Sequence, residues 1–278
     1  MIDLHLHTTA SDGHCTPAEL LARAHEAGLT IVAVTDHDTV TAVPGAIEAA
    51  RRLGMRSVPG IELSTETDGA DVHVLGYFLD PGAPELDRFL SDRRLSRIER
   101  VRVMAGRLAG LGCPIDVERL LREAESRLDL SIGRPQVARA LVEAGHARDI
   151  ADGFDRFLAV GRPAHVPHNA ATPADAIRMI NAAGGLASIA HPGVLGRDDL
   201  IEAFAAAGLS AIEAYYPDHS ADETARYLDL ARRLGLGVTG GSDYHADPHH
   251  GAAAPGAVTL PAEEFGRLEQ LLAARANR

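Results

Sequence analysis

MIDLHLHTTASDGHC occupies residues 1–15, and its first half supplies the first predicted strand. Polar and apolar side chains alternate over residues 2–7, which is the pattern of a β-strand. Period two places Asp3, His5 and His7 on one face and the apolar side chains on the other. A strand that directs imidazoles inward suits a chemical site at its C-terminal end. One His-x-His pair is weak evidence alone, so the rest of the chain must support it.

Six more strand-like runs follow, and helical stretches alternate with them. The strand-like runs cover residues 30–35, 56–64, 72–79, 186–190, 211–215 and 236–241. The helical stretches cover residues 17–27, 44–53, 173–183, 198–207, 222–234 and 261–274. This alternation predicts an α/β fold built as a parallel, barrel-like sheet. In such barrels the chemistry collects at the C-terminal ends of the strands.

One region interrupts the alternation. Residues 96–168 are helical and rich in arginine, with no convincing strand. We interpret them as a helical insertion over the barrel mouth, and residues 1–95 and 169–278 as the barrel domain. An ordinary run of barrel helices is the alternative, but so long a gap between strands argues against it.

Composition limits the functional classes. The net charge of −12 opposes stable binding to duplex nucleic acid, which relies on many basic contacts to phosphates. All 27 basic residues are arginines, so Schiff-base catalysis and a carboxylated-lysine metal bridge are excluded. No apolar run is long enough to span a membrane. Cys15 and Cys113 cannot build a disulfide framework, so we expect a cytoplasmic protein.

Metal-ligating residue types recur at the ends of the predicted strands. The residues are His37 after the second strand, Glu62 in the third, His73 in the fourth, His191 after the fifth, and Asp243 and His245 after the seventh. Residues placed independently would rarely show this coincidence. The pattern therefore predicts a metal centre at the barrel mouth. A closed structural zinc site would usually be rich in cysteine, which this chain is not.

The same motifs carry a resemblance to a known family. Asp-Leu-His-Leu-His-Thr at residues 3–8, Thr-Asp-His at 35–37, Gly-Ile-Glu at 60–62 and Gly-Ser-Asp-Tyr-His at 241–245 resemble the successive motifs of the PHP (polymerase and histidinol phosphatase) family of phosphoesterases. The resemblance implies a distorted seven-stranded (β/α)7 TIM-like barrel with two or three metal ions. The insertion resembles that of the subgroup that removes the 3′-phosphate from nucleoside 3′,5′-bisphosphates.

Carried over residue by residue, the resemblance implies three ligand sets. They are His5 and His7 with Glu62 and Asp243 for the first ion, Glu62 with His73 and His191 for the second, and Asp12, His37 and His245 for the third. Some family members have a histidine in place of Asp12, which leaves His14 as a rival ligand. Glu62, His191 and Asp243 are the residues expected to act closest to the reaction.

Neutral imidazoles and a few carboxylates cannot neutralise several divalent ions. The metal cluster would therefore keep a net positive charge, which suits a phosphate dianion. Two ions can share a bridging hydroxide that attacks phosphorus. Mixed nitrogen and oxygen ligands suit Mn²⁺, Fe²⁺ or Zn²⁺, and we favour Mn²⁺. The leading prediction is a phosphatase that converts a small nucleotide such as adenosine 3′,5′-bisphosphate to AMP. The alternatives are a 5′-to-3′ exonuclease on short RNA, a histidinol phosphatase and a non-enzymatic metal-binding module.

Two residues are candidates for contacts with the substrate. Arg134 precedes Pro135 at a predicted helix start, where a guanidinium and backbone N–H groups together can bind a phosphate. A salt bridge on a solvated face is the alternative for Arg134. His168 closes the insertion and is expected near the barrel mouth. Asp36 and Asp71 flank proposed ligands, and we expect each to orient an imidazole N–H.

Overall fold

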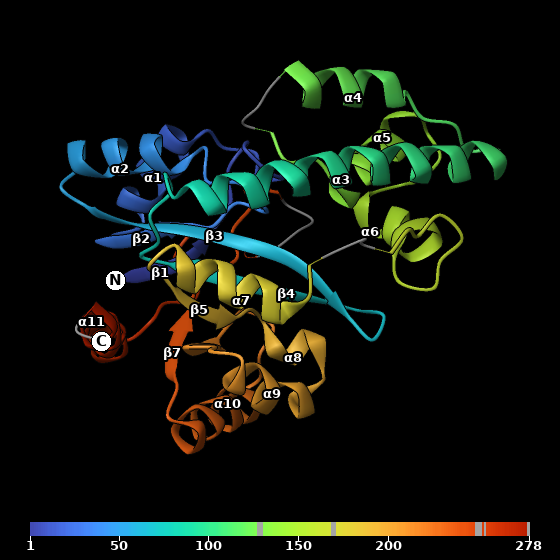
Figure 1. Ribbon diagram of the computed structural model, residues 1–278. Coiled ribbons are helices and arrows are strands. Elements are labelled where there is room, and N and C mark those ends of the chain that lie inside the picture. The colour runs from blue at the N-terminus through green and yellow to red at the C-terminus, as the bar shows by residue number, and fades with distance from the viewer. Residues whose placement is uncertain (127–129, 168–170, 248–251, 253, 277–278) are drawn as a thin grey trace.

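A seven-stranded sheet curls into a nearly closed barrel in this computed structural model, which describes residues 1–126, 130–167, 171–247, 252 and 254–276 (Figure 1). The strands follow chain order. They are β1 (Ile2–Leu6), β2 (Ile31–Val34), β3 (Arg56–Thr67), β4 (Ala70–Tyr77), β5 (Leu186–Ile189), β6 (Ala211–Tyr215) and β7 (Gly237–Gly240). A bridge between Leu6 and Tyr244 brings the first and last strands together.

One strand runs against the others, which corrects the prediction of a fully parallel sheet. β3 and β4 form a long hairpin, and β4 pairs antiparallel with both β3 and β5. The two-residue turn between them leaves no room for a crossover helix. Because β4 is reversed, His73 lies near its start yet at the rim where the parallel strands end. It pairs directly with Ser64 of β3.

Helices surround the barrel, and several begin at hydrogen-bonded caps. Thr16, Thr172 and Ser220 each accept a bond from the backbone three residues on, which satisfies an N–H left free at the helix start. The barrel helices are α1 (Pro17–Glu26), α2 (Val43–Arg52), α7 (Pro173–Ala182), α8 (Pro192–Leu195), η2 (Asp198–Leu200), α9 (Ile201–Ala206), α10 (Ala221–Leu234) and α11 (Ala262–Ala276).

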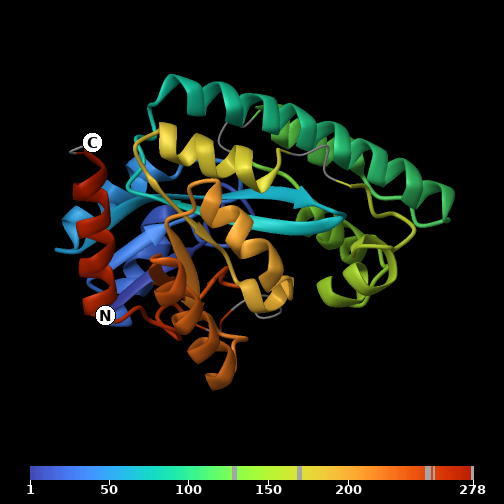
Figure 2. The ribbon, with the colours of Figure 1, turned by 60° about the horizontal axis from the view of Figure 1, so that its bottom comes forward.

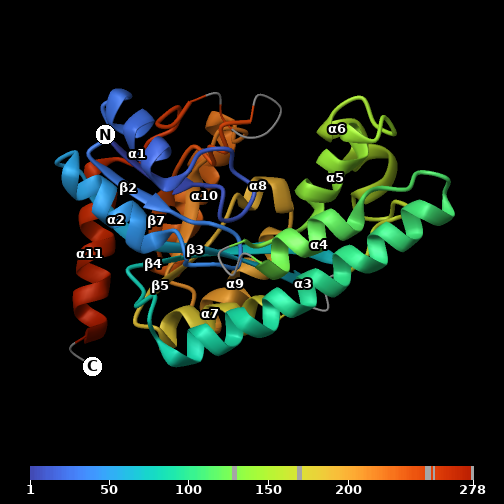
Figure 3. The same cartoon turned by 90° about the horizontal axis from the view of Figure 1, so that it is seen from above.

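The central helices form a second hydrophobic cluster beside the barrel. They are α3 (Pro84–Gly110), α4 (Val117–Ser126), α5 (Arg134–Glu143), α6 (Ile150–Gly153) and the π-helical turn η1 (Phe154–Leu158). Figure 2 shows α3 passing over α7. Figure 3 shows α4, α5 and α6 on one side of α3, towards its C-terminal half. None of the helices in the described ranges is both long and apolar enough to cross a membrane.

Helix α3 belongs to both hydrophobic clusters. Leu86 packs in the barrel core, whereas Ile98 and Val101 pack with Val137 and Leu158 of the insertion. The predicted start of the insertion, residue 96, therefore lies inside a continuous helix. The change from one cluster to the other nevertheless falls between Leu86 and Ile98, close to the start proposed for the helical insertion.

Candidate metal centre

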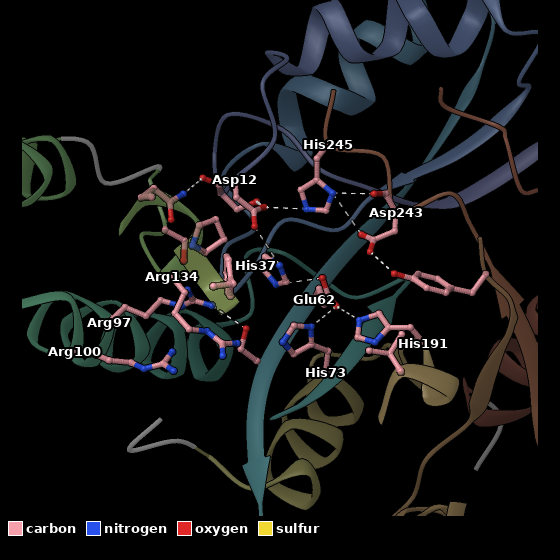
Figure 4. A pocket seen from close by; sticks show the side chains of 18 residues that line it. Asp12, His37, Glu62, His73, Arg97, Arg100, Arg134, His191, Asp243 and His245 are labelled. Carbon is pink, nitrogen blue, oxygen red and sulfur yellow. Dashed lines mark hydrogen bonds and ion pairs between the residues drawn. The ribbon is translucent and has the colours of Figure 1, made fainter. Parts of the chain in front are cut away.

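Glu62 lies at the centre of a group of imidazoles at the barrel mouth (Figure 4). Its Oε2 atom lies 3.3 Å from Nε2 of His5, 3.3 Å from Nε2 of His7 and 3.1 Å from Nδ1 of His37. Its Oε1 atom lies 2.8 Å from Nδ1 of His73 and 3.3 Å from Nε2 of His191. One buried carboxylate thus faces five histidines that come from four segments of the chain. This is the arrangement that a carboxylate bridging two cations would need.

Two further carboxylates extend this group on either side. Asp243 Oδ1 lies 3.2 Å from Nε2 of His5 and 3.1 Å from Nε2 of His7. Asp12 lies 3.6 Å from both His7 and His37, and its Oδ1 atom lies 3.3 Å from Nε2 of His245.

The ligating atoms converge in three groups whose members lie within 4.8 Å of one another. These groups are His5 with His7 and Asp243, His37 with Glu62 and His73, and His7 with Asp12, His37 and His245. They overlap with the three predicted sets but differ in membership: Glu62 is not grouped with His5, His7 and Asp243, and His37 instead of His191 is grouped with Glu62 and His73. His191 belongs to none of the three groups, although its Nε2 atom lies 3.3 Å from Oε1 of Glu62.

Several of these atoms are buried without a hydrogen bond, although carboxylates or imidazoles face them. They include both ring nitrogens of His7, Nδ1 of His37, Oδ2 of Asp12 and Oδ1 of Asp243. Burying such polar atoms costs free energy unless they bind something. Imidazole nitrogens and carboxylate oxygens are ligands that Mn²⁺, Fe²⁺ and Zn²⁺ accept. The donor set therefore fits divalent cations.

The electrostatics of the group also favour added positive charge. Burial alone would lower the pKa of His7, but attraction to Asp243 and Glu62 outweighs it and raises that pKa to about 10. Burial would raise the pKa of Glu62, yet the imidazoles of His37, His73 and His5 hold it well below its usual range. Burial prevails at His37 and lowers its pKa to about 3. The carboxylates thus remain ionised and draw a cation towards them.

The backbone that presents the rim ligands is strained. His191 has a φ of 28° and Asp243 a φ of 51°, both in the left-handed region that side chains with a Cβ avoid. Such conformations cost about 1–3 kcal/mol each and persist where the surrounding structure holds them. His191 is the second residue after β5 and Asp243 the third after β7, so both strained positions lie in the turns at the barrel mouth.

Two buried carboxylates that support this centre were not predicted. Glu213 accepts hydrogen bonds from Nδ1 of His5 and from the backbone N–H of His191. Asp3 accepts bonds from the hydroxyl and N–H of Ser242 and from the N–H of Gly256, which secures the loop after β7. The available signal was an acidic residue inside a strand that is otherwise apolar or metal-ligating.

The predicted roles of Asp36 and Asp71 are wrong. Asp36 accepts hydrogen bonds from the N–H and hydroxyl of Thr8 and from the hydroxyl of Ser11. It therefore shapes the loop after β1 instead of orienting an imidazole. Asp71 pairs with Nη1 of Arg134 at 2.9 Å. Sequence spacing could not reveal these partners because they come from distant segments.

The imidazole group lines a cavity with a volume of about 230 Å³, and Arg134 lines the same cavity. Besides its pairing with Asp71, its guanidinium lies 5.7 Å from the centre of the Phe154 ring. Arg97 and Arg100 line the same wall (Figure 4). Burial, together with Arg134 and Arg97, lowers the pKa of Arg100 to about 9. Asp71 and Asp38 already pair with Arg134 and Arg97, so Arg100 is the guanidinium whose charge a bound anion would stabilise most.

Two residues named from the sequence remain: His14 as a rival metal ligand and His168 as a substrate contact. His14 is 41% exposed at its side chain and lies 3.6 Å from Asp247, outside the three groups of convergent atoms. His168 lies outside the described residues.

Comparisons with known proteins agree with this geometry. The family model described as PHP domain matches residues 3–147. A 3′,5′-nucleoside bisphosphate phosphatase of Chromobacterium violaceum is 37% identical over 88% of this chain and 87% of its own length. The 5′-3′ exoribonuclease Rnm of Salmonella typhimurium is 37% identical over 87% and 84%. A solved protein from Bifidobacterium adolescentis, assigned as a metal-dependent phosphoesterase, superposes with a TM-score of 0.86 at 29% identity, covering 96% and 94%.

Proposed function

This chain belongs to the PHP family of metal-dependent phosphoesterases, and from that premise we propose that it removes the 3′-phosphate from nucleoside 3′,5′-bisphosphates. The products would be a nucleoside 5′-monophosphate and inorganic phosphate. The observation that carries the proposal is a single cavity that joins the Glu62 group to a wall of three arginines. A substrate with two phosphates needs both features.

Eight of the proposed metal ligands belong to the convergent groups, and His191 is added because it contacts Glu62. We propose that two or three divalent ions, with Mn²⁺ favoured, are held by His5, His7, Asp12, His37, Glu62, His73, His191, Asp243 and His245. When bound, such ions supply an activated water and neutralise charge on the phosphoryl oxygens. Glu62 faces the largest number of these imidazoles, so its loss should disturb more than one ion.

Hydrolysis breaks the bond between phosphorus and O3′ of the ribose. The oxygen of a water molecule bonds to phosphorus, and O3′ leaves with the electron pair and takes up a proton. Asp243 is held for this reaction by the hydroxyl of Tyr216, which donates to Oδ2 at 3.0 Å. Burial, together with Asp243, raises the pKa of Tyr216, so its hydroxyl remains a donor throughout.

Arg134 is the proposed contact for the 5′-phosphate. A guanidinium carries five N–H donors, and the Asp71 contact through Nη1 fixes its orientation while other donors face the cavity. Arg134 is part-buried, so its charge is screened less than that of a surface arginine. A substrate without a 5′-phosphate would leave this site unused.

The 5′-to-3′ exoribonuclease activity named for the Salmonella relative is the second candidate. Both reactions attack phosphorus and release O3′ of the 5′-terminal nucleotide, and they differ in whether the attacked phosphorus is a terminal monoester or a diester that carries the rest of the RNA. A net charge of −12 disfavours a long polyanion and therefore favours the smaller substrate.

A substrate panel tests this choice. Mn²⁺-loaded protein is incubated with adenosine 3′,5′-bisphosphate, 5′-AMP, histidinol phosphate and a short 5′-phosphorylated RNA, and phosphate and nucleotide release are measured. We expect phosphate from the bisphosphate, with AMP as the coproduct and little release from AMP itself. Faster release of mononucleotides from RNA would establish the second candidate, and no release from any substrate would refute both.

A further inference from the structure

A groove of about 460 Å³ opens beside the metal centre. Its outer part is lined by Gly69 of the β3–β4 turn with Ala70 at the start of β4, by Val160 after η1, and by Val194 and Leu195 of α8. Three segments far apart in the sequence thus form its walls. None of the side chains of these five described residues carries a hydrogen-bonding group. Asp71 also lines the groove, and its carboxylate is already paired with Arg134 at 2.9 Å.

Two of these walls expose large apolar side chains. Val160 is 54% exposed and Val194 is 63% exposed, on the insertion and the barrel respectively. Single exposed valines are common, but two that line the same groove form an apolar binding surface.

The groove is continuous with the proposed site. His73, His191, Arg134 and Val194 line both the groove and the cavity that holds the Glu62 group. A molecule bound at the imidazoles and at Arg134 would therefore reach the valines without leaving the protein surface. The metal ligands, the arginine wall and the apolar groove meet around Arg134.

We infer that this groove binds the nucleobase of the substrate. This inference rests on the proposed function and extends it to the third part of a nucleoside bisphosphate. The ribose carries two phosphates and a base, and the structure offers three adjoining surfaces of matching chemistry: imidazoles and carboxylates for the reacting phosphate, arginines for the 5′-phosphate, and valines for the flat apolar faces of the base.

The chemistry of the groove also sets its specificity. Discrimination among bases requires side chains that hydrogen-bond their edges, as in sites that reject analogues lacking a polar group. The valine walls contact the faces of a base, which all four bases share. The groove therefore accepts purines and pyrimidines alike, and the bisphosphates of the four ribonucleosides should differ in kcat/KM by less than about tenfold.

A double variant, Val160→Ser with Val194→Ser, tests the groove on metal-loaded full-length protein. Its kcat/KM for adenosine 3′,5′-bisphosphate should fall about five- to tenfold, because apolar contact with the base is lost. An abasic analogue, with hydrogen in place of the base, should be hydrolysed equally by the variant and the native protein. Val160→Phe should act in the opposite direction for adenosine, since an aromatic ring stacks on a base. Val103→Ser is the matched control, because Val103 is 37% exposed on α3 and does not line the groove.

Equal losses on both substrates, or no loss on either, would overturn the nucleobase assignment. Equilibrium binding of 5′-AMP and ribose 5-phosphate separates this failure from failure of the proposed function. If no bisphosphate is hydrolysed, the groove assignment is still supported when the native protein binds AMP more tightly than ribose 5-phosphate and the serine variant binds the two equally. If AMP and ribose 5-phosphate bind equally to the native protein, the groove does not bind the base.

Discussion

Glu213 on β6 accepts a hydrogen bond of 2.9 Å from Nδ1 of His5 on β1. Its second oxygen accepts a bond of 2.7 Å from the backbone N–H of His191, a residue with strained backbone. Both Glu213 and His5 are fully buried. A proton held on Nδ1 leaves Nε2 of His5 directed towards Glu62 and Asp243. Glu213 is therefore a positioning residue that links two of the proposed metal-binding histidines.

Glu213→Gln should weaken metal binding about 10- to 100-fold, as the loss of carboxylates behind metal-bound histidines commonly does. An amide has only one acceptor oxygen, so it cannot accept from both His5 and His191. Calorimetric titration of the metal-free protein with Mn²⁺ measures the change. Glu202→Gln, at an exposed position of α9, is the control and should bind as the native protein does. Native affinity in the Glu213 variant would exclude the positioning role.

Removal of metal should lower thermal stability. A ligand at 100 times its dissociation constant stabilises by about 2.7 kcal/mol, which for a chain of this size corresponds to about 5–10 °C in Tm. The stabilisation is expected because the ions would satisfy buried atoms that make no hydrogen bond among the described residues. Calorimetric scans before and after addition of Mn²⁺, Fe²⁺ or Zn²⁺ measure it. An unchanged Tm with all three metals would contradict the proposed centre.

The stoichiometry of bound metal tests the three groups separately. Asp12 contributes to only one of them, with His7, His37 and His245. Asp12→Ala should therefore reduce the metal content by one ion per chain, as measured by mass spectrometry of the purified protein. Asp152→Ala, whose carboxylate lies in the insertion and pairs with Arg148 and Arg156, should leave the content unchanged. Loss of all metal from the Asp12 variant would show that the groups do not fill independently.

Asp38→Asn should destabilise the protein by about 3–5 kcal/mol, because it breaks a buried ion pair from one side. Asp38 accepts a 2.6 Å bond from Nε of Arg97, whose other nitrogens bond to Ser64 and to the carbonyl of Ile132. Burial alone would raise the pKa of Asp38, but Arg97 and Arg93 lower it, so the carboxylate is charged.

Urea denaturation measures this loss in free energy of unfolding. The control is Asp92→Asn, at an exposed position of α3, the helix that carries Arg97. It should change the free energy of unfolding by less than about 0.5 kcal/mol. Replacing both partners, Asp38→Asn with Arg97→Met, should cost less than Asp38→Asn alone, since no uncompensated charge stays buried. A loss below about 1 kcal/mol for Asp38→Asn would mean that this pair does not fix the insertion to the barrel.

Gly241→Ala should disrupt the centre by steric means. A Cβ atom there would lie 2.4 Å from the backbone nitrogen of His5 and 2.7 Å from Oδ1 of Asp3. Overpacking of this kind costs about 1–3 kcal/mol and would displace β1 from the loop that carries Asp243. Tm and metal content measure both effects. Gly106→Ala, where the added carbon meets nothing within 4 Å, should be neutral or stabilising. A Gly241 variant that keeps native metal content would contradict the close packing.

The alternation of strands and helices was sufficient to predict the barrel and its site-bearing rim. Runs such as residues 2–7 have a period of two whichever partner they pair with, so the strands were found locally. The direction of β4 was predicted wrongly because strand direction depends on pairing and not on periodicity. His73 was nevertheless a correct choice for the rim, since the reversal of β4 brings the start of that strand to the mouth.

The supporting residues depended on tertiary structure. Glu213 and His5 are 208 positions apart, and nothing in the spacing of either one indicates the other. The sequence does not distinguish Arg97 from the other arginines of its helix, yet Arg97 is buried and pairs with Asp38.

Side-chain alternation and strand termini are local properties of the chain, so the residue types at the ends of the strands could be found without a structure. The pairing of carboxylates with histidines, the arginine that faces the cavity and the groove between two valines became known from the folded barrel alone. Those contacts join segments whose distance is set by how the barrel closes and how α3 places the insertion, and neither is encoded in any single stretch.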